Sequence, residues 1–138
     1  MGLNGFGRIG RAVTRIALMR DSFDIVRINT RKTSNEMVAY LLKYDSTYRT
    51  FPMDVKKLDD GIDIEGKIIK TTQTDKPEEI PWDHNEVDVV IDATGAFTKK
   101  EDLVKHIKGP VKKVILTAPA KDDETPQVVL GVNDDMID

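Results

Sequence analysis

Gly5-Phe6-Gly7-Arg8-Ile9-Gly10 is the stretch of this sequence that decides the fold. Its glycines follow the spacing G-x-G-x-x-G, between a short apolar segment at residues 1–4 and a helical pattern that begins near Arg8. Gly5 permits a tight turn out of a strand, Gly7 leaves room for a ligand beside the backbone, and Gly10 lets the helix pack closely. The stretch therefore predicts a strand, a tight turn and a helix within a βαβ unit.

The same turn predicts a site for the pyrophosphate of a dinucleotide. Backbone N–H groups at the start of the helix, near Arg8 and Ile9, would face the phosphate groups, and the helix dipole favours negative charge there. The alternative is a glycine-rich turn without a ligand. The strand before the glycines and the helix after them favour the dinucleotide.

Strand and helix patterns alternate along most of the chain, which indicates a parallel α/β sheet. Helices are predicted over residues 8–20, 34–43 with Ser34 as N-cap, and 99–107. In the first helix Ile9, Ala12, Val13, Ile16 and Ala17 recur at helical spacing, and in the second Met37, Val38, Leu41 and Leu42 share a face. Besides residues 1–4, short apolar runs predict buried strands over residues 23–29, 87–92, 113–117 and 127–132.

Residues 50–74 have a different pattern. Turn signals at Asp60-Gly61 and Glu65-Gly66 separate short apolar alternations, which predicts two or three antiparallel strands. Residues 77–84 predict a loop or a single helical turn. The predicted fold class is α/β: a Rossmann-type, doubly wound, mostly parallel sheet with a short antiparallel excursion in the middle, in one domain over residues 1–138.

The composition fits one soluble domain and excludes several classes of protein. The chain has 138 residues, 39 % of them hydrophobic, and a formal net charge of −3. This charge argues against nucleic acid or an anionic membrane as partner. No apolar run approaches the roughly 18 residues of a membrane span, and the N-terminus does not resemble a signal peptide. We therefore expect a cytoplasmic protein without a membrane partner.

The chain contains no cysteine, which excludes a disulfide, a cysteine-ligated zinc site and a thiol nucleophile within these residues. The two histidines, His84 and His106, lie in polar stretches, and neither has a second histidine at metal-binding spacing. We interpret both as surface residues and predict no metal site.

The end of the second strand departs from the usual NAD-binding pattern. An acidic residue normally ends this strand and accepts hydrogen bonds from the adenosine ribose, but the chain here reads Asn29-Thr30-Arg31-Lys32. A carboxylate would repel a 2′-phosphate, whereas Arg31 or Lys32 would attract one. The sequence therefore favours NADP, or use of both NADP and NAD; alternatively, both cations simply point into water.

Longer stretches resemble the glyceraldehyde-3-phosphate dehydrogenase family. Residues 4–11 resemble its N-terminal signature, and similar segments follow in the same order: Lys43-Tyr44-Asp45-Ser46-Thr47, Asp92-Ala93-Thr94-Gly95-Ala96-Phe97, Val114-Ile115-Leu116-Thr117-Ala118-Pro119 and Gly131-Val132-Asn133. The resemblance extends over essentially the whole chain. Erythrose-4-phosphate dehydrogenase, whose cofactor domain looks similar, is the alternative within the superfamily.

The resemblance implies a set of cofactor-binding residues. Residues 7–9 would contact the pyrophosphate and its sugar, residues 29–31 would border the adenosine ribose, and Thr74 would lie near the adenine. Thr94, Gly95 and Phe97 would follow the centre of the cofactor, with Thr117 and Ala118 beside the nicotinamide-side ribose. The full predicted set is Gly5, Gly7, Arg8, Ile9, Gly10, Asn29, Thr30, Arg31, Thr74, Thr94, Gly95, Phe97, Thr117 and Ala118. Ordinary strand-end hydrogen bonds for Thr94 and Thr117, and a core position for Phe97, are the alternatives.

The resemblance also implies where the family's chemistry lies. The family oxidises an aldehyde through a thiohemiacetal on cysteine, passes hydride to the nicotinamide and releases the acyl group to phosphate, which needs an activated thiolate. That cysteine belongs to a Ser-Asn-Ala-Ser-Cys-Thr-Thr-Asn-type segment beyond a Gly-Val-Asn such as residues 131–133, and the sequence ends at Asp138. We expect a cofactor-binding domain without the catalytic domain and C-terminal helix, with no catalytic residue of its own and no activity alone.

Partners and other functions follow from the same reading. Apolar surface that a C-terminal helix covers in relatives would be exposed, so we expect a homo-oligomer or a complementing catalytic segment. A non-catalytic module that senses or sequesters a dinucleotide is a second function, and a scaffold or nucleic-acid-binding role is a third. The acidic balance and the lack of a basic stripe with interleaved aromatics disfavour nucleic acid.

Overall fold

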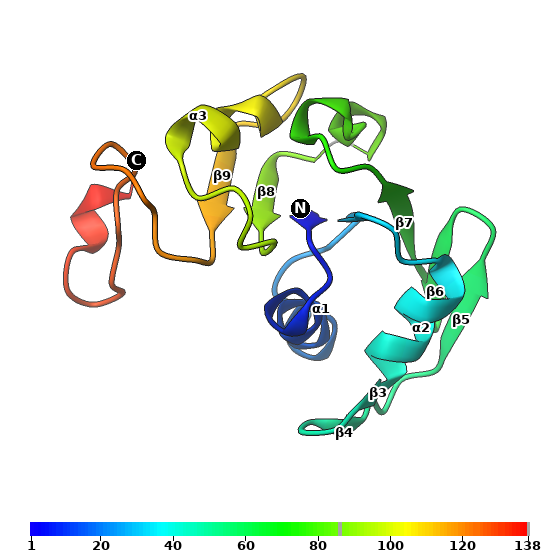
Figure 1. Cartoon of the computed structure of the whole chain (residues 1–138). Coiled ribbons are helices and arrows are strands. Elements are labelled where there is room, and N and C mark those ends of the chain that lie inside the picture. The colour runs from blue at the N-terminus through cyan, green and yellow to red at the C-terminus, as the bar shows by residue number, and fades with distance from the viewer. Residues whose placement is uncertain (86, 138) are drawn as a thin grey trace.

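The computed structural model describes residues 1–85 and 87–137 as an α/β domain (Figure 1). The strands are β1 (Gly2–Asn4), β2 (Arg27–Thr30), β3 (Tyr44–Asp45), β4 (Arg49–Thr50), β5 (Val55–Leu58), β6 (Gly61–Ile64), β7 (Lys67–Gln73), β8 (Val89–Asp92) and β9 (Lys113–Leu116). The α-helices are α1 (Arg8–Arg20), α2 (Asn35–Lys43) and α3 (Lys100–Leu103). Short 3-10 helices are η1 (Pro77–Glu79), η2 (Trp82–Asn85), η3 (Val104–His106) and η4 (Asp134–Met136).

The main sheet has seven strands in the order β5-β6-β7-β2-β1-β8-β9. Strands β7, β2, β1, β8 and β9 pair in parallel, and β5 and β6 add antiparallel beyond β7. From β1 the chain first builds outward through β2 to β7, then returns to place β8 on the other side of β1. This reversal is the predicted doubly wound topology, and β5–β6 is the predicted antiparallel excursion. Strand β7 belongs to both parts, because it pairs antiparallel with β6 and parallel with β2.

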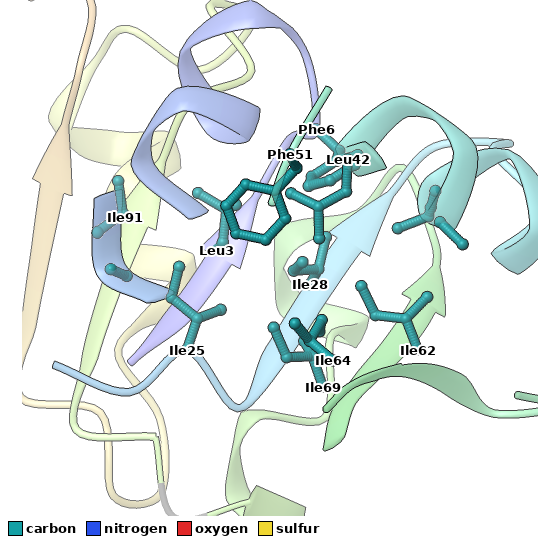
Figure 2. Packing of buried hydrophobic residues seen from close by; sticks show 13 residues of the cluster. Leu3, Phe6, Ile25, Ile28, Leu42, Phe51, Ile62, Ile64, Ile69 and Ile91 are labelled. Atoms are coloured by element: carbon teal, nitrogen blue, oxygen red, sulfur yellow. The ribbon is translucent and has the colours of Figure 1, made fainter. Parts of the chain in front are cut away.

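Both faces of the sheet are covered at its central strands β1, β2 and β8. The prediction of a buried strand at residues 113–117 is wrong in its burial, because β9 is the edge strand and its Ile115 is 48 % exposed. Figure 1 shows α1 and α2 on one face and α3 with the neighbouring 3-10 turns on the other. Under α1 and α2, Leu3, Ile28 and Phe51 belong to the larger apolar cluster (Figure 2). On the opposite face Ile80, Trp82, Val87, Val90 and Val111 form a second cluster. Burial on both faces explains why the strands read as continuous apolar runs rather than alternating ones.

Helix α1 has the predicted bounds, but apolar spacing alone does not give its buried face. Gly10, Thr14, Arg15 and Ala17 are buried, whereas Ile9 and Ile16 are 54 % and 46 % exposed. The cause is Gly10, because a Cβ atom there would overlap the carbonyl oxygen of Gly5. Only the face that carries Gly10 can therefore lie against the turn after β1. In α2 the predicted N-cap is confirmed, since the Ser34 Oγ accepts a hydrogen bond from the Met37 N–H at 3.3 Å.

The predicted last strand at residues 127–132 is wrong. Asn133 closes a local turn there: its Oδ1 accepts from the Val129 N–H at 2.7 Å, and its Nδ2 donates to the Gln127 carbonyl at 2.9 Å. These backbone groups would otherwise be available to a strand ladder. Leu130 at the tip of the turn is 84 % exposed.

Two further predictions need correction. Strand β2 begins at Arg27 rather than at residue 23, because its neighbour β1 is short and the pairing between them starts at Gly2 and Arg27. The predicted helix at residues 99–107 is one α-helical turn, α3, followed by the 3-10 turn η3. No helix in the described part of the chain is long and apolar enough to cross a membrane.

Candidate functional site

A cleft of about 390 Å³ lies at the carboxyl ends of β1, β2, β7 and β8. The cleft lies where the strand order reverses, between β1 and β8. Open α/β sheets bind ligands at such switch points. The residues that line it are Asn4, Gly5, Phe6, Gly7, Asn29, Thr30, Arg31, Thr33, Thr74, Asp75, Pro77, Ile80, Ala93, Thr94, Ala96 and Phe97. The volume is within the range of about 300–1,000 Å³ that is usual for small-molecule sites.

The N-terminus of α1 opens at this cleft. Its N-cap residue is Gly7, which has no side chain to bond the first N–H groups of the helix. A Cβ atom at Gly7 would have no other atom within 4 Å, so the space beside this backbone is open. The first N–H groups of any helix lack an intrahelical acceptor, and they attract anions together with the helix dipole. Open space and unmatched donors thus coincide at Gly7.

Gly5 joins two strand ends at the base of the cleft. Its φ of +97° is in the left-handed region, and a Cβ atom would lie 2.8 Å from the Thr94 backbone nitrogen. Only glycine satisfies both constraints. The turn after β1 can therefore rest directly on the turn after β8.

A row of polar side chains crosses the sheet beneath the cleft. The register aligns Asn4 of β1 with Asn29 of β2 and Asp92 of β8, and aligns Asn29 with Thr72 of β7. Thr72 Oγ1 donates to Asn29 Oδ1 at 3.0 Å, and Asn29 Nδ2 donates to Asn4 Oδ1 at 2.8 Å. Asn4 Nδ2 in turn donates to Asp92 Oδ2 at 2.9 Å. The row thus holds four strand ends in fixed positions around the site.

Asp92 is fully buried and ends this row. Its Oδ1 accepts from the Thr94 hydroxyl at 2.6 Å and from the Thr94 N–H at 3.1 Å. Burial raises the pKa of Asp92, but its hydrogen bonds from His106, Thr94 and Asn4 outweigh burial and hold the pKa below its ordinary value. The carboxylate is therefore the charged form, and it orients Thr94 at the cleft wall.

His106 is fully buried, so its interpretation as a surface residue was wrong. Its Nε2 lies 3.2 Å from Asp92 Oδ2, and its Nδ1 accepts from the Trp82 indole N–H at 3.2 Å. The polar neighbours Lys105 and Lys108 concealed this burial in the sequence. His84 is exposed, as expected.

The far end of the cleft, past β2, lacks the usual carboxylate at position 30. The Thr30 hydroxyl closes a turn, because it accepts from the Thr33 N–H at 3.3 Å and donates to the Thr33 carbonyl at 3.2 Å. Arg31 is exposed and lines the cleft, whereas Lys32 is exposed outside it. An acidic residue does line this cleft, Asp75, which follows β7.

The structure brings together about half of the predicted site residues. Gly5, Gly7, Asn29, Thr30, Arg31, Thr74, Thr94 and Phe97 line the cleft, and Arg8, Ile9, Gly10, Gly95, Thr117 and Ala118 do not. The Arg8 guanidinium reaches instead toward the hydroxyls of Thr47 and Ser46, at 3.3 and 3.4 Å. Thr117 follows β9, with its N–H bonded to the Asp92 carbonyl at 3.1 Å.

Other lining residues were not identified from the sequence. Asn4 could have been found, since a polar residue at the end of a buried strand and beside the glycine turn points to the site edge. Asp75 could be identified only if β7 were known to be a parallel strand of the main sheet. The prediction of antiparallel strands over residues 50–74 did not include this pairing. Phe6, Thr33, Pro77, Ile80, Ala93 and Ala96 complete the wall.

Comparison with known proteins agrees with this geometry. Residues 1–100 match the family described as glyceraldehyde 3-phosphate dehydrogenase, NAD binding domain. The chain is 47 % identical over 133 residues to glyceraldehyde-3-phosphate dehydrogenase 1 of Candida glabrata, which covers 96 % of this chain and 40 % of that protein. It is 44 % identical over 138 residues to glyceraldehyde-3-phosphate dehydrogenase 1 of Bacillus cereus, covering 100 % of this chain and 41 % of that protein.

The chain thus spans about two fifths of the length of these relatives. The family match extends over β1 to β8 and includes every residue that lines the cleft. The chain belongs to the family of glyceraldehyde 3-phosphate dehydrogenase NAD-binding domains.

Proposed function

We propose that this domain binds a nicotinamide dinucleotide in the cleft, with the pyrophosphate over the N-terminus of α1. The observation that carries the proposal is the open space at Gly7 beside the uncapped N–H groups of α1. A pyrophosphate has the charge and the acceptor atoms that such a helix end binds. A Cβ atom at Gly7 would have no neighbour within 4 Å, which leaves space beside these N–H groups.

The remaining cofactor groups follow the cleft in both directions from Gly7. Asn29, Thr30 and Arg31 would border the adenosine ribose, and Thr74 would lie near the adenine. Thr94 and Phe97 would follow the centre, while Thr117 and Ala118, beyond β9, would flank the nicotinamide-side ribose. The bound nicotinamide supplies hydride acceptance, and the protein binds and orients it.

NADP is the favoured form of the cofactor, with NAD as the alternative. Arg31 lines the cleft and supplies a cation where a 2′-phosphate would lie, and position 30 supplies no carboxylate to repel it. Asp75 in the same cleft opposes this preference by its charge. Isothermal titration calorimetry with both cofactors decides between them, and tighter NAD than NADP binding would contradict the preference.

For the whole protein we propose oxidation of an aldehyde with phosphorylation, the reaction of a glyceraldehyde-3-phosphate dehydrogenase. The names of the relatives favour this reaction over that of an erythrose-4-phosphate dehydrogenase. These 138 residues contain no cysteine, so they supply no thiolate for covalent catalysis. A polypeptide of these residues alone should bind cofactor without turnover, and activity sensitive to iodoacetamide would contradict this.

The substitution Gly7→Val tests the cofactor site directly. A Cβ at Gly7 would have no other protein atom within 4 Å. Valine is a poorer N-cap than glycine and should lower stability by about 1 kcal/mol, and thermal melting checks that the variant folds. Its side chain would occupy the space needed by the pyrophosphate, and dinucleotide affinity should fall at least about tenfold, or 1.4 kcal/mol. Ser22→Val, at an exposed position past the other end of α1, is the matched control and should bind normally. Unchanged affinity in Gly7→Val, or no binding by the unmodified chain, would refute the proposal.

We also propose that this domain pairs with a second copy or with a catalytic segment. Ile16 and Met19 of α1, Ile115 of β9 and Leu130 are all exposed apolar side chains, at 46, 62, 48 and 84 %. Extensive apolar exposure tends to mark interfaces. Light scattering at increasing concentration tests this, and a monomer throughout would count against self-association.

A further inference from the structure

The hydrogen bonds that run from Trp82 through His106 to Asp92 have a direction that is set by the residues at the two ends. A carboxylate only accepts, and an indole N–H only donates. Asp92 is the acceptor end, and Trp82 is the donor end on the side of the sheet that carries His106. The positions of the protons between them therefore follow from these two residues.

The tautomer of His106 is one consequence. Because the Trp82 N–H donates to His106 Nδ1, that nitrogen carries no proton. The proton of the neutral ring is then on Nε2, 3.2 Å from Asp92 Oδ2, and donates to it. His106 is thus held as the Nε2–H tautomer, with a hydrogen bond to each side.

A second consequence concerns the carboxylate. Asp92 Oδ2 accepts from His106 and Asn4, and Oδ1 accepts twice from Thr94, through its N–H and its hydroxyl. These bonds use the acceptor positions of both oxygens. A further donor could bond this carboxylate only by displacing one of these four hydrogen bonds.

The third consequence reaches the cleft. The only proton of the Thr94 hydroxyl is directed at Asp92, 2.6 Å away, so its Oγ1 can offer only lone pairs elsewhere. One lone pair accepts from the Ala96 N–H at 3.1 Å. The other remains for the cleft that Thr94 lines. Such an acceptor attracts a ligand hydroxyl and repels a phosphate oxygen.

We propose that His106 and Asp92 are positioning residues that fix Thr94 as a hydrogen-bond acceptor, which selects a ribose hydroxyl of the cofactor at the centre of the cleft. This inference rests on the proposed dinucleotide binding and names one specific recognition within it. With the adenosine ribose at the end of β2, Thr94 lies after β8 on the other side of β1, so the ribose concerned is the one on the nicotinamide side of the pyrophosphate. Neither Asp92 nor His106 lines the cleft, so both act through the lining residues that Asp92 holds, which are Thr94 and Asn4; the side-chain acceptor that this inference concerns is that of Thr94.

The ligand series ADP, ADP-ribose and NAD separates this recognition from the rest of the site. ADP has no second ribose, ADP-ribose adds it, and NAD adds the nicotinamide. Thr94→Val keeps the shape of the side chain and removes the acceptor oxygen. Calorimetry should show ADP-ribose and NAD weakened by about fivefold to tenfold, and ADP within twofold of the unmodified chain.

Substitutions of His106 test the positioning step. His106→Gln can keep both hydrogen bonds, since its carbonyl can accept from Trp82 and its amide can donate to Asp92; it should restore binding close to that of the unmodified chain. His106→Leu removes both bonds and should weaken ADP-ribose and NAD more than ADP. His84→Gln makes the same chemical change at an exposed histidine and is the matched control. Thermal melting of each variant separates a loss of fold from a loss of recognition.

Nitrogen-15 NMR of the unmodified domain gives an independent readout. The long-range proton–nitrogen pattern of His106 should show a protonated Nε2 and an unprotonated Nδ1. A proton on Nδ1 overturns the inference whether or not cofactor binds. This measurement and Thr94→Val also decide the matter if His106→Leu does not fold.

The outcomes distinguish the two proposals. If the unmodified chain binds neither NAD nor NADP, the proposed function fails. If it binds NAD but Thr94→Val weakens ADP as much as ADP-ribose, Thr94 serves the pyrophosphate and the present inference fails. If Thr94→Val binds each of the three ligands as tightly as the unmodified chain does, the present inference also fails.

Discussion

Gly10 lies so close to the carbonyl oxygen of Gly5 that any Cβ atom at position 10 would overlap that oxygen. This contact sets the rotation of α1 and brings its N-terminus to the cleft. It also explains why Ile9 and Ile16 face outward although they are apolar.

Gly10→Ala should therefore destabilise the domain. Within an exposed helix, glycine to alanine gains about 1 kcal/mol, but here the backbone must shift, at a cost of about 1–3 kcal/mol as for other overpacked sites. Urea unfolding followed by circular dichroism measures the change. Ala12→Gly in the same helix calibrates the intrinsic propensity. A Gly10→Ala variant as stable as the unmodified chain would show that the contact is not restrictive.

Arg31 and Asp75 should have opposite effects on cofactor choice. Arg31→Gln should weaken NADP by about tenfold, or 1.4 kcal/mol, and leave NAD nearly unchanged, because only NADP carries the 2′-phosphate. Asp75→Asn removes a negative charge from the cleft and should strengthen NADP. Lys32→Gln is the control, since Lys32 lies outside the cleft wall. Titration calorimetry measures all three, and an equal loss of NAD and NADP in Arg31→Gln would contradict the assignment.

Asp92 should contribute to the acid sensitivity of the fold. Its pKa is lowered in the folded chain, with burial opposed by hydrogen bonds from His106, Thr94 and Asn4. A lowered folded pKa stabilises the fold above the unfolded value, near about 4, and this stability is lost as pH falls through the folded pKa. The free energy of unfolding should therefore decrease from about pH 5 downward.

Asp92→Asn should flatten part of this acid dependence. At neutral pH it should also destabilise the domain by about 1–3 kcal/mol, because an amide cannot accept at both positions and leaves a buried donor unmatched. The pKa values of Asp45 and Asp122 are also lowered, mainly because each carboxylate accepts hydrogen bonds from backbone N–H groups. Some acid dependence should therefore remain in Asp92→Asn. Urea midpoints between pH 7 and pH 3, about the range of carboxylate titration, provide the comparison. If the stability of Asp92→Asn fell with pH as steeply as that of the unmodified chain, Asp92 would not contribute to the acid sensitivity.

Arg15 should be among the most sensitive charged positions. It is buried in α1, and its guanidinium donates to the Leu42 carbonyl at 2.7 Å and to the Arg49 carbonyl at 3.1 Å. It thus ties the end of α2 and the β3–β4 hairpin to α1. Arg15→Met would leave these acceptors without their donor and should cost about 2–4 kcal/mol. Arg20→Met, exposed in the same helix, should change stability by less than about 0.5 kcal/mol. If Arg15→Met and Arg20→Met changed stability equally, water would replace the Arg15 guanidinium at these carbonyl groups without loss of stability.

The sequence predicts best those elements whose causes are local. The bounds of α1 follow from the glycines before it and the end of its apolar pattern, and the Ser34 cap gives the start of α2. The doubly wound, mostly parallel arrangement follows from the glycine turn and from the alternation of strands and helices. Thr94, two residues after β8, comes instead from the resemblance of residues 92–97 to a known family.

What the sequence does not predict depends on contacts between distant segments. The burial of His106 arises from Trp82 and Asp92, which are 24 and 14 residues away. The polar row needs the register of β7, β2, β1 and β8, and no local pattern specifies it. Residues 127–132 have strand-like composition, but the amide of Asn133 engages their backbone in a turn.

Trp82 is the only tryptophan in the chain. It packs on Gly2, where a Cβ atom would overlap its ring, and it donates to His106. All indole fluorescence of the domain therefore originates at the donor end of the hydrogen bonds that lead to Asp92. Reduced nicotinamide absorbs light where indole emits it. The domain thus carries a natural optical label, whose emission colour reports on its own buried surroundings and whose quenching reports on the arrival of a reduced dinucleotide.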